Sequence, residues 1–316
     1  MILPRGVRPM LATAGALPPD DPAWAYEVKW DGVRVLASVQ EGRLRLASRV
    51  GNDVTGGYPE LAALGAAVER PVLLDGEVVA LTATGVPDFG LLQSRMHVRS
   101  PSAALRASTP VTFVVFDLLH VGGTSLLDQT YDDRRGCLEA LALAGPHWQV
   151  APAFLGEGAA LAEVTRAQGM EGVVAKRRDS PYLPGRRSGC WVKAKHVHRT
   201  SAVVVGWKPG EGGRSGRLGS LLLGVSGPDG LVFAGHVGTG FSGAVLALLG
   251  ERLAPLRRDD PAVPDVPREH ARHAVWVEPR LVVDVEYTQW TRDGRLRHPS
   301  YKGLRDDLDP GEVVRE

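Results

Sequence analysis

The chain has 316 residues, of which 44% are hydrophobic and 23% charged, and its formal net charge is +1 at pH 7. This composition is typical of a globular protein with one large or two medium domains, and the charge excludes a basic surface over the whole chain, so any nucleic-acid contact must be a local patch. Two cysteines, Cys137 and Cys190, exclude a disulfide framework and a cysteine zinc cluster, and the lack of a signal peptide or membrane-spanning run predicts a cytoplasmic protein with no membrane contact.

The first part of the chain predicts strands with a few helices between them. Residues 1–22 are rich in proline and predict an irregular arm laid over the first domain. Alternating residues predict two strands over 24–39 with a turn at Asp31-Gly32, and a partner strand over 42–48. The further expected elements are helices over 58–70, 88–98, 132–145 and 158–169, an apolar strand over 71–81 that is interrupted at Leu74-Asp75-Gly76-Glu77, and a buried strand over 111–119.

One lysine stands out in the first pair of strands. Lys29 is followed by Asp31, Gly32 and Arg34, in the pattern Lys-x-Asp-Gly-x-Arg. A lysine amine attacks only when neutral, which holds for roughly one in a thousand exposed lysines at neutral pH, and the cation Arg34 would disfavour the ammonium form. Gly32 lets the backbone approach a nucleotide, and the Asp31 carboxylate is available to a hydroxyl, a metal or the lysine. The pattern predicts a lysine that attacks a nucleoside triphosphate, while this stretch alone also fits an ordinary strand and turn.

Three later residues each have two interpretations. Arg49 lies in the turn 48–53 and is either a ligand-binding arginine or a solvated turn residue. Glu77 either binds a ribose hydroxyl or a magnesium ion, or it is a solvated acid in a hairpin turn. Phe116 either stacks on a purine base or belongs to the core.

The densest region of charge runs from Glu171 to Arg199. Between Lys176 and Arg199 there are eight basic residues and one acid, Asp179. Residues 171–176 predict a strand with opposite charges at its ends, and Lys193 and Lys195 share one face of a strand over 191–195. Because like charges this close repel each other, we expect a polyphosphate between the two lysines, and the alternative is a solvated basic strand.

The remainder of the chain predicts a small barrel. Strands are expected over 202–207, 218–225, 231–237, 275–287 and 295–298, with a helix over 241–256 and a proline-rich loop over 261–266. Five or so strands around one helix indicate an OB-fold. The glycine-rich loop 209–217 could approach a DNA backbone, or it is a plain hairpin loop.

Six of these segments, in this order, resemble the nucleotidyltransferase motifs of ATP-dependent DNA ligases. They are Lys-Trp-Asp-Gly-Val-Arg at 29–34, Ser-Arg-Val-Gly at 48–51, Leu-Asp-Gly-Glu at 74–77, Val-Phe-Asp-Leu-Leu at 115–119, Glu-Gly-Val-Val-Ala-Lys at 171–176 and Trp-Val-Lys-Ala-Lys at 191–195. Within the family the chain resembles compact bacterial ligases and the ligase module of bacterial end-joining ligases. The resemblance implies an α+β fold, with a nucleotidyltransferase domain of antiparallel sheets and flanking helices over 1–198 and an OB-fold domain over 199–316.

The resemblance also implies a site. Lys29 would take AMP as a phosphoramidate, Glu27 would lie beside the adenine, and Phe116 would stack on its ring. The segment 297–305 resembles the C-terminal ligase motif, which orients the pyrophosphate leaving group. The other expected contacts are Arg34 and Glu77 with the ribose; Arg49, Arg187, Lys193 and Lys195 with phosphates; Lys176, Arg297, Lys302 and Arg305 with the leaving group or DNA; and Glu171, assisted by Asp31 or Glu77, with magnesium or manganese.

The function implied is that of an ATP-dependent DNA ligase in DNA repair, which seals nicks or breaks in duplex DNA through a lysyl-AMP intermediate. The chain carries no helical DNA-binding domain before Trp24 and no polymerase or nuclease module, so we expect a monomer that grips DNA with two domains or with an end-joining or repair partner. Two alternatives are an RNA ligase or capping-type nucleotidyltransferase, and a non-catalytic OB-fold module that binds nucleic acid. The intact Lys29 disfavours the second, because a binding module needs no nucleophile.

Overall fold

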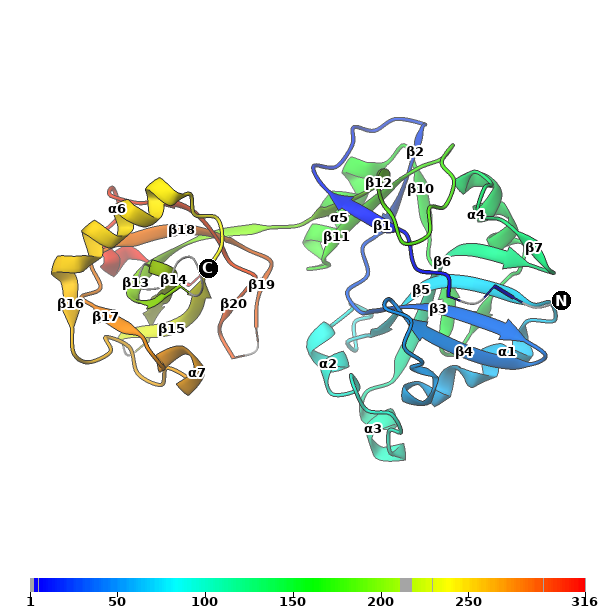
Figure 1. Ribbon diagram of the computed structural model, residues 1–316, viewed down its shortest axis with the longest axis horizontal. Coiled ribbons are helices and arrows are strands. Elements are labelled where there is room, and N and C mark those ends of the chain that lie inside the picture. The colour runs from blue at the N-terminus through cyan, green and yellow to red at the C-terminus, as the bar shows by residue number, and fades with distance from the viewer. Residues whose placement is uncertain (1–2, 5, 211–217, 229, 292, 316) are drawn as a thin grey trace. The chain divides into compact units, whose positions relative to one another are not determined.

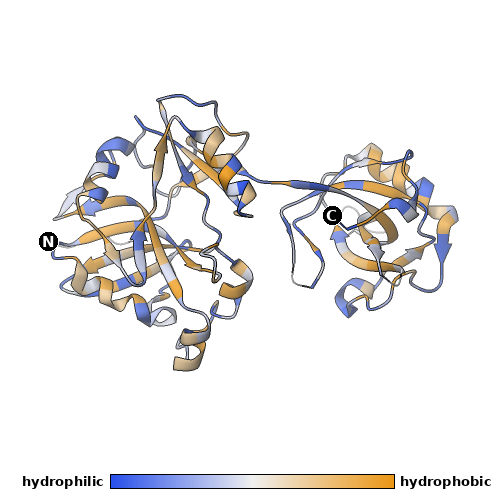
Figure 2. Cartoon of the chain, turned by 180° about the vertical axis from the view of Figure 1, so that it is seen from behind, coloured by the Kyte–Doolittle hydropathy of each residue, from blue (hydrophilic) through white to orange (hydrophobic). Residues whose placement is uncertain are grey.

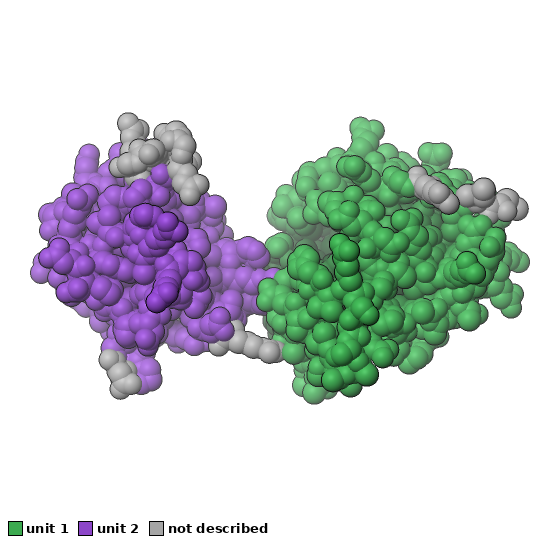
Figure 3. All heavy atoms as spheres, turned by 60° about the horizontal axis from the view of Figure 1, so that its bottom comes forward, with its two compact units in different colours: residues 1–196 green, residues 197–316 purple. Residues whose placement is uncertain are grey.

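The computed structural model describes residues 3–4, 6–210, 218–228, 230–291 and 293–315. The chain divides into two compact units, residues 1–196 and residues 197–316, which Figure 3 colours separately. The boundary predicted after residue 198 falls at the start of strand β13, His198–Pro209. In the part of the chain that the structure describes, no helix is long and apolar enough to cross a membrane.

One sheet of the first unit carries the strand before Lys29 and both strands of the basic region. Its order is β1-β12-β11-β2-β10, antiparallel except that β1 pairs with β12 in parallel (Figure 1). Val174 is in register with Glu27 on one side and with Lys193 on the other, so these three side chains share one face of the sheet. The strands are β1 (Leu11–Ala14), β2 (Trp24–Val28), β10 (Ala153–Leu155), β11 (Gly172–Arg177) and β12 (Arg187–Lys195).

The second sheet of this unit follows the order β4-β3-β5-β6-β9-β8, with β7 paired to β6. Arg34 lies directly opposite Glu77, so these two side chains share one face. The strands are β3 (Val33–Gln40), β4 (Arg43–Ser48), β5 (Val72–Ala80), β6 (Val111–Val121), β7 (Thr124–Ser125), β8 (Ala144–Gly145) and β9 (Trp148–Val150). The main core of the unit packs against this sheet, with Val35, Leu46, Leu74 and Phe113 fully buried.

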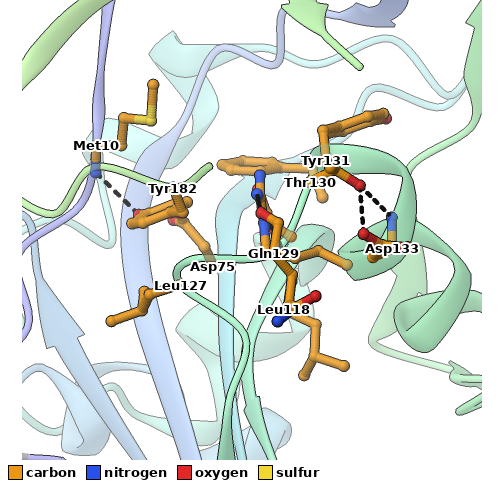
Figure 4. Close-up of polar contacts among 12 residues, drawn as sticks. Met10, Asp75, Leu118, Leu127, Gln129, Thr130, Tyr131, Asp133 and Tyr182 are labelled. Carbon is orange, nitrogen blue, oxygen red and sulfur yellow. Dashed lines mark hydrogen bonds and ion pairs between the residues drawn. The ribbon is translucent and has the colours of Figure 1, made fainter. Parts of the chain in front are cut away.

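The helices of the first unit are short. Thr130 caps α4 by accepting a hydrogen bond from the backbone N–H of Asp133 at 3.1 Å (Figure 4), and α4 therefore begins at Tyr131. The helices are α1 (Leu64–Ala67), α2 (Phe89–Gln93), α3 (Ala103–Ser108), α4 (Tyr131–Glu139) and α5 (Gly158–Ala167), with 3₁₀ turns η1 (Thr55–Gly57) and η2 (Pro59–Ala63).

The second unit is the OB-fold β-barrel. Strands run in the order β15-β14-β13-β17-β16, and β18 joins β13 to β21. Helix α6 lies beside the strands of this unit (Figure 1), and its Leu249 and Leu253 side chains belong to the barrel core. Besides β13, the elements are β14 (Leu218–Gly227), β15 (Gly230–Val237), α6 (Gly243–Leu253), η4 (Ala254–Leu256), β16 (Arg257–Arg258), α7 (Arg268–Ala271), β17 (Val275–Val277), β18 (Val282–Tyr287), β19 (Gln289–Trp290), β20 (Leu296–Arg297), β21 (Ser300–Leu304) and η5 (Pro310–Glu312). Figure 2 shows that the long strands of both units carry the most hydrophobic residues.

The structure corrects the expected interruption of the strand over 71–81. Strand β5 runs without a break through Asp75, Gly76 and Glu77, so the hairpin-turn alternative is wrong. A Cβ atom on Gly76 would lie 2.5 Å from the carbonyl oxygen of Val114, so glycine lets β6 pair closely at this point. The carboxylate of Asp75 is tolerated here because Arg34 neutralises it.

Several expected lengths are also wrong. The helix expected over 58–70 is a 3₁₀ turn over Pro59–Ala63 followed by the one-turn α-helix Leu64–Ala67, and that expected over 88–98 covers only Phe89–Gln93. The helix over 132–145 ends at Glu139, and Ala142 then adopts a left-handed φ of 47°. The strand over 275–287 is divided at 278–281, where Pro279 has no N–H to donate. Strand β21 was not predicted, and residues 211–217 of the glycine-rich loop lie outside the described residues.

Candidate active site

A cavity of about 230 Å³ in the first unit is lined by residues of both sheets. The nine lining residues that the sequence singled out are Glu27, Lys29, Arg34, Arg49, Glu77, Phe116, Lys176, Arg187 and Lys193. The others are Leu11, Ala12, Val28, Trp30, Val174 and Trp191.

Lys29 follows directly after β2, and its backbone N–H donates to the carbonyl of Gly172 at 2.9 Å. Its Nζ forms an ion pair with Glu171, whose other carboxylate oxygen lies 2.7 Å from Nζ of Lys195. Burial raises the pKa of Glu171, but Lys29 and Lys195 outweigh burial and hold it below its usual range. Glu171 therefore stays ionised and is the group best placed to receive a proton from Lys29.

Arg34, the cation that the sequence analysis expected beside Lys29, is bound by a buried carboxylate. Arg34 donates to both oxygens of Asp75, at 3.0 Å from Nε and 2.6 Å from Nη2, so its charge is largely neutralised. Burial lowers the pKa of Lys193, and the charges of Lys29, Lys195 and Arg187 lower it further. Lys193 is therefore a second cation of the cavity whose charge interacts with that of Lys29.

Gly32 also has a different reason to be glycine. A Cβ at this position would lie 2.2 Å from the carbonyl oxygen of Val78, which belongs to β5. The close approach that the structure shows at Gly32 is therefore between the bend before β3 and strand β5.

Glu27 and Lys176 form the most enclosed part of the cavity. The carboxylate of Glu27 accepts a hydrogen bond from the hydroxyl of Tyr131 at 2.7 Å and pairs with Nζ of Lys176 at 2.8 Å. That Nζ also donates to the Phe116 carbonyl at 3.1 Å and lies 4.5 Å from the ring centroid of Trp191. Burial lowers the pKa of Lys176 and outweighs the neighbouring Glu27.

This position corrects the sequence-based role of Lys176. The lysine is only 1% exposed, and its Nζ is held by Glu27 and Phe116 beside Trp191. It cannot reach across to DNA without breaking this buried ion pair, which is costly. Lys176 therefore belongs with the groups expected at the base, and not with those expected at DNA or the leaving group.

Three of the four expected phosphate ligands line the cavity, and the fourth does not. Arg49 and Lys193 line the cavity, and Arg187 does so while its Nη1 donates to the carbonyl of Ala12. Lys195 is not part of the lining, since it pairs with Glu171 beside Lys29. Glu171 therefore already relieves the repulsion between Lys193 and Lys195 that was taken to require a polyphosphate.

The expected metal ligands do not form a ready-made metal site. Among the described residues, no group of three or more His, Cys, Asp or Glu side chains is placed to hold a metal ion, so Asp31, Glu77 and Glu171 do not converge as a trio. Burial raises the pKa of Glu77 to about 8, against the opposing charges of Arg34 and Lys29. Magnesium is commonly held by one or two carboxylates together with substrate phosphates, and Glu77 and Glu171, close enough to influence each other, fit that donor set.

The raised pKa of Glu77 makes the stability of the first unit dependent on pH. The folded protein keeps the proton that the unfolded chain releases near pH 4.5, so stability falls as pH rises from about 4.5 to 8. We expect Glu77→Gln to melt with the wild type at pH 5 and about 5 °C above it at pH 8.5 in thermal unfolding without nucleotide. The exposed control Glu163→Gln should follow the wild type at both pH values, and an equal shift of Glu77→Gln at both would contradict this account.

The three expected C-terminal ligands lie in the second unit and have partners there. Lys302 pairs with Glu286 at 2.6 Å, and Arg305 pairs with Asp284 at 3.2 Å and with Asp307 at 2.8 Å. Arg297 is on β20, opposite Gln289.

Sequence reasoning missed four residues that hold the site in place. Asp75 and Trp191 lie inside motifs that the sequence analysis recognised. Their burial, which points to a structural role in the site, could not be read from the sequence. Tyr131 and Tyr182 give no local signal, because Glu27 and Asp75, the carboxylates to which they donate, are more than a hundred positions away.

Comparisons with known proteins identify the family of the chain. Residues 9–195 match the family described as "ATP dependent DNA ligase domain", and residues 214–308 match "ATP dependent DNA ligase C terminal region". The chain is 47% identical over 311 residues to the multifunctional non-homologous end joining protein LigD of Mycobacterium bovis, covering 98% of this chain and 40% of that protein. It is 36% identical over 318 residues to a probable DNA ligase of Streptomyces griseus, covering 95% of this chain and 59% of that protein.

Solved structures give the same result. The crystal structure of the ligase domain from M. tuberculosis LigD is 45% identical, with a TM-score of 0.56 and 98% of each chain covered. A mycobacterial DNA ligase D complexed with ATP is 44% identical, with a TM-score of 0.56 and the same coverage. The chain thus spans about 40% of the length of the end-joining protein it matches, and 98% of a separately solved domain. Its two matched regions and its identity to these relatives show that the chain belongs to the ATP-dependent DNA ligase family.

Proposed function

We propose that this chain seals 5′-phosphate/3′-hydroxyl nicks or breaks in duplex DNA with ATP, through AMP bound covalently to Lys29. The observation that carries the proposal is the position of Lys29, at a cavity whose lining includes the buried pair Glu27–Lys176 and the cations Arg49, Arg187 and Lys193, with a carboxylate on its Nζ. Lysine is the residue suited to this role, because it can give up its proton and attack phosphorus.

The base end suits adenine. Phe116 and Trp191 supply aromatic surface, and Glu27 supplies an acceptor for the exocyclic amino group of the base. Lys176 and Tyr131 hold Glu27 from two sides, so the acceptor is already oriented before the nucleotide arrives. Arg34 and Glu77, opposite each other on β3 and β5, are the groups proposed for the ribose.

In the first step, Nζ of Lys29 attacks the α-phosphorus of ATP. A nitrogen–phosphorus bond forms, the bond to pyrophosphate breaks, and the proton leaves Nζ toward Glu171. Arg49, Arg187 and Lys193 stabilise the negative charge that accumulates on the phosphates. Glu171 and Glu77 are proposed to hold magnesium or manganese with the phosphates, and that ion would neutralise part of the same charge.

In the later steps, AMP passes to the 5′-phosphate of a nick, and the 3′-hydroxyl displaces AMP to seal the strand. Contacts with the duplex are expected mainly at phosphates, with little reading of sequence. We further propose that the chain acts in the cytoplasm, as a monomer or with a repair partner, in end joining, since its mycobacterial relatives are end-joining proteins.

Labelled nucleotide tests the proposal. The protein is incubated with labelled ATP or GTP, and the isolated adduct is then chased with nicked DNA or nicked RNA. We expect an adduct from ATP alone, and transfer of its label to DNA. An adduct from GTP, or transfer only to RNA, would favour an RNA ligase or capping-type enzyme, and no adduct at all would favour a binding module.

The C-terminal segment should act in the first step more than in the last. Deleting the segment would remove β21 and the buried Tyr301, so a point substitution is the better test. We expect Lys302→Ala to slow adduct formation about tenfold, because it removes a cation proposed for pyrophosphate, while sealing of nicks that already carry 5′-AMP changes less than about twofold. Lys302→Arg, which keeps the charge, should stay near the wild type, and equal losses in the two assays would contradict the assigned role.

A further inference from the structure

The N-terminal arm, defined here as residues 7–14, is fastened to the loop formed by residues 180–187. The backbone N–H of Gly185 donates to the Arg8 carbonyl at 3.0 Å, and the N–H of Leu11 donates to the Arg186 carbonyl at 2.8 Å. Beyond these contacts, Leu11 and Ala12 line the nucleotide cavity, and the Ala12 carbonyl accepts a hydrogen bond from Arg187. The arm is therefore a wall of the cavity and not only a cover of the domain.

One side chain of the loop connects this arm to the interior. The hydroxyl of Tyr182 accepts a hydrogen bond from the backbone N–H of Met10 at 2.9 Å and donates to Oδ2 of Asp75 at 2.6 Å (Figure 4). Tyr182 is 1% exposed, and burial, with the charge of Asp75, raises its pKa well above the usual range. The phenol therefore keeps its proton and remains a donor to Asp75 at any pH at which the protein works.

Asp75 passes this constraint to Arg34. Its side chain is fully buried, and it binds Nε and Nη2 of Arg34 in a two-point contact that fixes the guanidinium plane. Asp75 does not bind Nη1 of Arg34. Since Arg34 lines the cavity, Nη1 is the nitrogen proposed to contact the nucleotide. Asp75 can hold this orientation only if its own carboxylate is fixed, and Tyr182 supplies the third donor that fixes it.

We propose that Tyr182 is a positioning residue for the nucleotide, which links the N-terminal arm through Asp75 to the ribose-side arginine, Arg34. The proposal rests on the proposed nucleotide role of this cavity. It assigns Tyr182 no contact with the nucleotide, since its hydroxyl proton is used by Asp75 and its acceptor position by Met10.

Tyr182→Phe tests this link, because it removes one oxygen and keeps the ring. The ring packs edge-on against Trp191 at a centroid distance of 5.6 Å, a contact that phenylalanine retains. We expect ATP binding without divalent metal, measured by calorimetry, to weaken roughly tenfold, and the KM for ATP in adduct formation to rise by a similar factor with kcat changed less than about twofold. The matched control is Tyr26→Phe, which also removes a fully buried phenol hydroxyl from this unit, one bonded to the Pro19 carbonyl at 2.6 Å, and it should leave both values unchanged.

A double-mutant cycle distinguishes positioning from a general loss of structure. Arg34→Lys keeps a cation beside Asp75 but cannot make the two-point contact. If Tyr182 acts through Arg34, adding Tyr182→Phe to Arg34→Lys should weaken ATP binding by less than about twofold. Unchanged ATP binding in Tyr182→Phe, or a tenfold loss that persists in the double variant, would overturn the proposal. Calorimetry measures ATP binding without transfer of AMP to the protein. Absence of an AMP adduct in the wild type would therefore contradict the proposed function, while the effect of Tyr182→Phe on ATP binding could still be measured.

Discussion

Lys29→Ala is expected to abolish the covalent AMP adduct and the sealing of ordinary nicks, while weak sealing of nicks that already carry 5′-AMP remains. The alanine variant has no nucleophile for the α-phosphorus, and a loss on the order of 10⁴-fold or more is typical when a nucleophile is removed. The last step needs the 3′-hydroxyl and the bound AMP but not the lysine amine. Gel assays with labelled ATP and with a synthetic 5′-adenylated nick measure the two activities separately.

Two variants sharpen this result. Lys29→Arg keeps a cation beside Glu171, so its fold should be unaffected, yet it should form no adduct because a guanidinium is effectively always charged. Lys208→Ala, which removes a half-buried lysine bonded to the Glu269 carbonyl in the second unit, should form the adduct at the normal rate. An adduct on the Lys29→Ala protein would show that the covalent residue has been misassigned.

Glu171→Gln is expected to have the second largest effect, with adduct formation slowed by about 10²- to 10³-fold. Glu171 contacts the nucleophile on one carboxylate oxygen and Lys195 on the other, and it is proposed to share the metal with Glu77. Glutamine preserves the shape but can neither take the proton from Lys29 nor balance two lysines. Single-turnover rates of adduct formation at saturating ATP give the loss directly.

The control for Glu171→Gln is the same substitution in an ion pair away from the cavity lining. Glu139 pairs with Arg135 at 2.6 Å on helix α4, and Glu139→Gln should change the rate by less than about twofold, since the Glu139 side chain is 57% exposed and i,i+4 pairs on a helix contribute little. If Glu171→Gln formed the adduct at the wild-type rate, Glu171 would be only a structural partner of Lys29 and Lys195.

The parts of the fold that could be predicted from sequence are those set by local pattern. The alternation of apolar and polar residues around Lys29 predicts β2 and β3, and the two-residue spacing of Lys193 and Lys195 predicts β12. These predictions succeed because successive side chains of a strand point to opposite faces, so the pattern is visible within a few residues. Helix lengths could not be predicted as well. The helical pattern after Tyr131 continues beyond Glu139, but β8 takes Ala144–Gly145 into a sheet.

The site shows the same division. The resemblance to ligase motifs identified nine of the residues that line the cavity, since each lies in or near one of these motifs. Partner choice could not be predicted, because it depends on contacts across the chain: Lys176 with Glu27, Asp75 with Arg34, and Tyr182 with Met10. These partners hold Lys176 at the enclosed end of the cavity, away from the leaving-group or DNA role expected for it, and they bind Arg34 to Asp75.

The central claim is that Lys29 carries AMP on the way to a sealed strand, and mass spectrometry with a chase tests it most directly. The protein is incubated with ATP and magnesium, digested, and the peptide that contains Lys29 is sequenced. In parallel, the intact adduct is mixed with a nicked duplex. We expect AMP on Nζ of Lys29 alone, lost at the rate at which adenylated and then sealed DNA appears. AMP on another residue, or a stable adduct on Lys29 that nicked DNA does not discharge, would contradict the account.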